Sequence, residues 1–136
     1  MRGGCRCGNI RLSWQLVDYS LVPRQCDCEF CRCRELVWVS KQGAPLDIDV
    51  MVPEHHAVVR QGTGRVDFHH CTRCKEIPVA TSVIDHQYYA VVNVACLHDR
   101  AVFAPPRPVD LTSATMDESI ARRRANWCSQ VTLRIR

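Results

Sequence analysis

The sequence has no apolar run long enough to cross a lipid bilayer, which takes about 20 consecutive apolar residues. Its longest apolar stretch lies around Ala90 to Leu97. The segment from Met1 to Cys5 also lacks the apolar core of a secretory signal peptide. We therefore expect a cytoplasmic protein that has no membrane partner.

Internal repeats and low-complexity tracts are absent too, which argues against repeat arrays and disordered linkers. Helical patterns are scarce. Only Asp117 to Trp127 has an acidic first turn and basic residues toward its end, as the helix dipole favours. We interpret Arg122 to Arg124 as the solvated end of this helix rather than as a phosphate-binding patch.

Most of the chain consists of short β-branched and aromatic runs that are separated by turn residues. The runs are Ile10–Val17, Leu36–Ser40, Leu46–Val52, Ala57–Gln61, Arg65–His70, Ile77–Ile84, Tyr88–Leu97 and Val131–Ile135. These runs predict a mostly β fold of short antiparallel strands, with one C-terminal helix.

The length of 136 residues fits one domain, since domains most often have roughly 100 to 150 residues. Three of the seven prolines lie between Ala104 and Pro108, and we expect the compact sheet to end there. We therefore expect residues 1–104 to form a β domain and residues 105–136 to be a C-terminal extension packed on the same domain.

Cysteine is abundant, with ten in the chain. In a reduced compartment, clustered cysteines are more often metal ligands than disulfides. Four of them, Cys26, Cys28, Cys31 and Cys33, fall within eight residues. Thiolates are soft ligands that favour zinc, and cysteines two and three residues apart allow one turn to direct several sulfurs at one ion.

Two further cysteine pairs, Cys5 with Cys7 and Cys71 with Cys74, each supply half of a second ligand set. Together they would close a tetrahedral structural zinc site. The central cluster could bind a second zinc through three of its thiolates and leave one position open for a reacting ligand. The sequence therefore predicts two zinc sites, of which one is structural and one is open.

The order of these motifs resembles the glutathione-dependent formaldehyde-activating enzyme family, which includes the centromere protein V group and has an Mss4-like β fold. The resemblance covers about Gly3 to Leu97. It rests on Gly-Gly-Cys-Arg-Cys-Gly-Asn-Ile-Arg at residues 3–11, on Cys-x-Cys-x-x-Cys-Arg at residues 26–32, and on Cys-x-x-Cys at residues 71–74.

The resemblance implies a carbon-sulfur lyase that joins glutathione to formaldehyde. Cys5, Cys7, Cys71 and Cys74 would hold the structural zinc, and Cys26, Cys28 and Cys31 would be the ligands of the open, catalytic zinc. The expected partners are a small-molecule thiol, such as glutathione, and an aldehyde. The residues that bind the thiol are not identified by the motifs.

Several alternatives stay open. Cys33 could be a fourth ligand that closes the second site, and His69 or His70 could compete as a ligand. The protein could instead be a non-catalytic zinc-binding module for protein or nucleic acid, or a thiol-based redox or metal sensor. We expect no nucleic-acid partner, because seven ligand thiolates together with two zinc ions would lower the formal charge of +4 to about +1. The sequence also allows a homo-oligomer.

Overall fold

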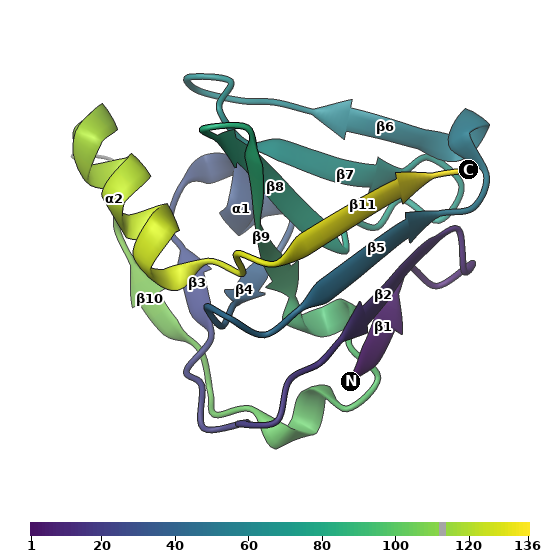
Figure 1. Ribbon diagram of the computed structural model, residues 1–136, viewed down its shortest axis with the longest axis horizontal. Helices are drawn as coiled ribbons and strands as arrows, with labels where there is room; N and C mark the ends of the chain where they lie inside the picture. Colours follow the sequence, from purple (N-terminus) through teal and green to yellow (C-terminus); the bar gives the residue numbers. More distant parts are fainter. Residues whose placement is uncertain (112–113) are drawn as a thin grey trace.

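The computed structural model describes residues 1–111 and 114–136, and within these residues the strands form two sheets (Figure 1). The smaller sheet has the order β1 (Arg2–Gly4), β2 (Ile10–Trp14), β5 (Leu46–Val50) and β11 (Val131–Ile135). The larger sheet has the order β10 (Arg107–Val109), β3 (Arg24–Cys26), β4 (Val37–Val39), β9 (Gln87–Asn93), β8 (Val79–Ile84), β7 (Asp67–Cys71) and β6 (His56–Val59). The prediction of a mostly β fold is confirmed.

The helices of the described residues are short. They are α1 (Glu29–Cys33), α2 (Met116–Asn126) and the single 3-10 turns η1 (Pro53–His55), η2 (Val94–Cys96) and η3 (Arg100–Val102). The predicted C-terminal helix is α2, which begins with a capping box: Thr115 Oγ1 accepts a hydrogen bond from the backbone N–H of Glu118, and the Glu118 carboxylate accepts one from that of Thr115. No helix in the described part of the chain is long and apolar enough to span a membrane.

A first hydrophobic core lies between the two sheets. In β2, Ile10, Leu12 and Trp14 are buried while the residues between them are exposed, which is the period of a strand with one buried face. The antiparallel partner β5 contributes its own alternate residues, so that Leu12 lies opposite Ile48. The larger sheet contributes Val92 of β9 to the same core.

The larger sheet is also covered on its opposite face, where a second core forms around Trp38, Phe68 and Ala80. Strand β8 therefore has buried residues on both faces: Val79 belongs to the first core and Ala80 to the second. A strand buried on both faces reads as a continuous apolar run rather than as an alternation, which explains the pattern of Ile77–Ile84.

The C-terminal extension contributes a strand to each sheet. β10 pairs in parallel with β3, and β11 pairs in parallel with β5. The expectation that the sheet ends in the proline-rich stretch is therefore wrong. Pro108 is accommodated because β10 is an edge strand, where a missing N–H leaves no neighbour without a partner.

Replacement of Gly4 by alanine should destabilise the fold. Gly4 has φ +144°, and a Cβ atom built on it would collide with the backbone oxygen of Ile10 across the β1–β2 pair. We expect the free energy of unfolding, measured by urea denaturation of the zinc-loaded protein, to fall by roughly 2 kcal/mol or more. Gly62→Ala is the control, since Gly62 has φ +61° but no atom within 4 Å of its Cβ position. Equal losses in both variants would contradict the steric explanation.

Candidate metal centre

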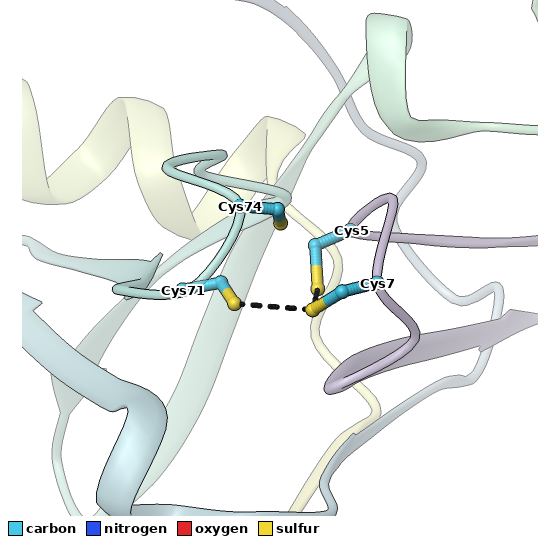
Figure 2. Close-up of side chains that lie close together, drawn as sticks. All are labelled: Cys5, Cys7, Cys71 and Cys74. Carbon is cyan, nitrogen blue, oxygen red and sulfur yellow. Dashed lines mark hydrogen bonds between the residues drawn. The ribbon is translucent and has the colours of Figure 1, made fainter.

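Four cysteine sulfurs converge from two turns that belong to different sheets (Figure 2). Cys5 and Cys7 lie in the connection between β1 and β2, whereas Cys71 ends β7 and Cys74 lies in the turn after it. All four sulfurs are within 4.8 Å of one another. The distance is 3.7 Å between the sulfurs of Cys5 and Cys7, and 3.5 Å between those of Cys7 and Cys71.

Backbone hydrogen bonds shape both turns. In the first turn, the Gly8 N–H donates to the carbonyl of Cys5 (2.9 Å) and the Ile10 N–H donates to the Cys5 sulfur (3.2 Å). In the second turn, the Lys75 N–H donates to the carbonyl of Cys71 (2.8 Å), and Lys75 itself has φ +68°. Lys75 therefore has a left-handed backbone conformation that glycine usually adopts.

Hydrogen bonds also join the two turns to each other. The Glu76 carboxylate accepts a bond from the backbone N–H of Arg6 (2.5 Å), and the Arg6 guanidinium donates to the carbonyl of Cys74 (3.1 Å). Asn9 is buried, and its amide donates to the carbonyl of His55 (3.2 Å). These contacts support the two cysteine turns without using the cysteine sulfurs.

The donor set fits a tetrahedral zinc ion. Sulfurs at about 2.3 Å from a common zinc lie roughly 3.8 Å apart, which is close to the two distances given above. Burial raises the pKa of Cys71, but hydrogen bonds from the backbone N–H groups of Cys74 and Arg73 outweigh it and lower this pKa to about 6. A thiol that ionises readily is a good metal ligand, because the thiolate is the form that binds.

The second group consists of Cys26, Cys28 and Cys31, whose sulfurs also lie within 4.8 Å of one another. Cys26 ends β3, and Cys28 caps α1, where its sulfur accepts a hydrogen bond from the backbone N–H of Cys31 (3.4 Å). The pKa of Cys26 is lowered to about 5 because the Cys31 thiol donates a hydrogen bond to its sulfur. These three ligands could hold a second metal ion and leave one coordination position free.

Cys33 does not belong to the second group, and its side chain is exposed. The reason is the local helix α1, which the sequence analysis described only as a turn. Residues two apart on a helix point in nearly opposite directions, so that Cys33 faces solvent when Cys31 faces the core. The geometry therefore favours the three-cysteine site.

No histidine of the described residues joins either group. His69 is buried, and its two ring nitrogens lie 2.9 Å from His56 Nε2 and 2.8 Å from Thr81 Oγ1. Burial lowers the pKa of His69 to about 4, so that the ring is neutral at pH 7. The alternative that His69 competes as a zinc ligand finds no support in this arrangement.

The second cysteine group opens into a cavity of about 620 Å³. Trp38, Phe68 and Val91 form an apolar wall, and Arg24, Arg122 and Arg123 lie along the rest of the lining. The interpretation of Arg122 to Arg124 as a solvated helix end is correct only for Arg124, which is exposed and forms an ion pair with Asp85. Arg123 is buried, and it lines the same cavity as residues of the larger sheet.

The cavity arginines of α2 were missed because the resemblance ends near Leu97 and the helix pattern is too polar to identify its buried side. One signal was present in the sequence. Trp127 and Arg123 are four residues apart, the spacing that places two side chains on one helix face, and the guanidinium of Arg123 lies 5.7 Å from the Trp127 ring centroid.

Comparisons with known proteins give the fold but no function. No protein-family model and no curated protein matches the sequence. The crystal structure of a Rhodobacter sphaeroides protein, a Northeast Structural Genomics target, is similar, with a TM-score of 0.62 and 25% sequence identity. The match covers 80% of this chain and 100% of that chain. The fold and the two cysteine groups together define a mostly β protein that could bind two metal ions.

The zinc content of the protein should test the role of Cys33. We expect two zinc ions per chain both in the wild type and in Cys33→Ser, because the Cys33 sulfur lies outside the group. Elemental analysis of protein purified without chelator, before and after reconstitution with zinc, gives the count. Loss of one zinc ion in Cys33→Ser would show that Cys33 closes the second site.

The two sites should differ in their effect on stability. Cys71→Ser removes a ligand that connects the two sheets, so that it should lower the melting temperature by roughly 15 °C or more, equivalent to about 4 kcal/mol. Cys28→Ser removes a ligand from a group that lies within one short segment, so it should lower the melting temperature much less. Thermal denaturation with Cys33→Ser as the control measures both effects. A larger loss in Cys28→Ser would contradict the structural role of the first site.

Proposed function

We propose that the protein is a zinc-dependent carbon-sulfur lyase of the glutathione-dependent formaldehyde-activating type, with an Mss4-like fold. The observation that carries this proposal is that the protein has two cysteine groups of different kinds. One group has four converging cysteines in a turn-to-turn junction, whereas the other has three cysteines facing a cavity. A three-ligand site next to a ligand-sized cavity is typical of catalytic zinc, and a four-ligand site is typical of structural zinc.

A zinc ion bound by the second group would supply Lewis acidity at its free position, where it favours the thiolate form of an incoming thiol. Cys26, Cys28 and Cys31 would hold that position at one end of the cavity. The apolar wall of Trp38 and Phe68 limits water around the reacting atoms, which strengthens electrostatic interactions there.

The reaction adds a thiol across an aldehyde carbonyl. A bond forms between the thiol sulfur and the carbonyl carbon, the carbonyl π bond breaks, and the proton lost by the thiol is balanced by one gained by the carbonyl oxygen. No oxidant or reductant is needed. The protein contributes proximity, because the thiol and the aldehyde would meet in one cavity of about 620 Å³. The reverse reaction is the lyase direction.

The proposal predicts that Cys28→Ser slows the reaction. We expect the zinc-loaded wild type to accelerate the exchange between glutathione with formaldehyde and S-hydroxymethylglutathione, measured by NMR exchange spectroscopy. Cys28→Ser should reduce kcat/KM by roughly a hundredfold, because the second site loses a ligand. Cys33→Ser should retain the wild-type rate. No acceleration by zinc-loaded wild type would refute the lyase and favour a non-catalytic zinc-binding module.

A further inference from the structure

The charged side chains in the cavity wall outside the cysteine group are all positive. Arg24 comes from β3, and Arg122 and Arg123 come from α2. No aspartate or glutamate is among the described residues that line this cavity. Three positive charges therefore share one cavity without an acidic side chain in the lining.

Arg123 carries the strongest evidence for a missing partner. Its side chain is buried, with 8% of the residue exposed, and its Nε atom has no hydrogen-bond partner in the described structure. Burial and the neighbouring charges of Arg122 and Arg65 lower the pKa of Arg123. A buried guanidinium with an unpaired N–H group and no carboxylate partner is costly, and an anion bound beside it would reduce that cost.

Among the described residues, five arginines outside the cavity form ion pairs with carboxylates. Arg32 contacts Asp27, Arg60 contacts Asp67, and Arg124 contacts Asp85. None of the ion pairs in residues 1–111 and 114–136 includes an arginine of the cavity. Arg24, Arg122 and Arg123, which a ligand in the cavity would contact, therefore form no ion pair with a carboxylate of the described residues.

Hydrogen bonds connect this wall to the sheet. Arg24 Nη2 donates to Ser40 Oγ (2.8 Å), and Ser40 Oγ donates to the carbonyl of Asn126 (2.8 Å) at the end of α2. The link joins β3, the strand that ends in Cys26, to the helix that carries Arg122 and Arg123. The cysteine group and the arginines are therefore held in a common frame.

We infer that Arg123, together with Arg122 and Arg24, binds a carboxylate of an acidic thiol whose sulfur occupies the open position at Cys26, Cys28 and Cys31. This inference rests on the proposed function and adds to it the residues that bind the carboxylate of the thiol. An arginine guanidinium binds a carboxylate through two parallel hydrogen bonds, which orients the ligand as well as attracting it. The C-terminal extension, outside the family resemblance, would then select the thiol.

Calorimetry with S-methylglutathione tests the carboxylate site without a free thiol. The zinc-loaded wild type should bind this probe, and Arg123→Gln should weaken the binding at least tenfold. Arg124→Gln, on the same helix but outside the cavity, should bind as the wild type does. The diethyl ester of the probe, which lacks both carboxylates, should bind the wild type at least tenfold more weakly than the acid. Equal binding of acid and ester, or equal binding by wild type and Arg123→Gln, overturns the inference.

Arg122→Gln provides a second test if Arg123→Gln does not fold, because Arg122 is only half-buried. Circular dichroism and zinc content establish whether each variant is folded. Arg122→Gln should also weaken binding of S-methylglutathione by several-fold or more. Unchanged binding in a folded Arg122→Gln would count against the inference, since Arg122 lines the same cavity.

Cobalt substitution separates failure of this inference from failure of the proposed function. A thiol that enters the metal site changes the sulfur-to-cobalt absorption. If glutathione and the neutral thiol mercaptoethanol change it with equal affinity in wild type and Arg123→Gln, the thiol site stands and the carboxylate site is refuted. If S-methylglutathione binding depends on Arg123 but no thiol changes the absorption, the carboxylate site stands and the proposed function is refuted.

Discussion

The rest of the structure depends on the junction at which four cysteine sulfurs from two sheets meet. Cys7 and Cys71 are 64 residues apart in sequence, yet their sulfurs are 3.5 Å apart. Cys7 lies in the turn between β1 and β2 of the smaller sheet, whereas Cys71 is the last residue of β7 in the larger sheet. A metal ion held there would connect the two layers at one corner and reduce the conformational freedom of the chain between them.

The larger sheet has two different roles on its two faces. One face packs on the smaller sheet through residues such as Val79 and Val92, and it supplies stability. The other face carries Trp38 and Phe68, the second cysteine group and the cavity. This division separates the residues that hold the layers together from those that would contact a ligand. It also allows the C-terminal helix to cover the cavity without entering the core between the sheets.

Much of the fold could be predicted because strand periodicity is a local property. The buried alternation of Ile10 to Trp14 and the helix signals of α2 both lie within short windows of sequence. The β10 strand could not be predicted in this way. Residues 107–109 have no strand pattern of their own, and they become a strand only because the edge of β3 offers unpaired backbone groups.

The sequence by itself determined which cysteines share one turn, because ligand spacing of two or three residues is a local constraint, whereas the meeting of Cys5 and Cys7 with Cys71 and Cys74 depends on the tertiary structure. The sequence did not determine the role of Cys33, which depends on the direction that a single helical turn gives its side chain. Nor did it determine the positions of Arg122 and Arg123. Only the tertiary structure decided that these charges line the cavity of the second cysteine group, because that position results from packing between segments roughly 100 residues apart in the chain.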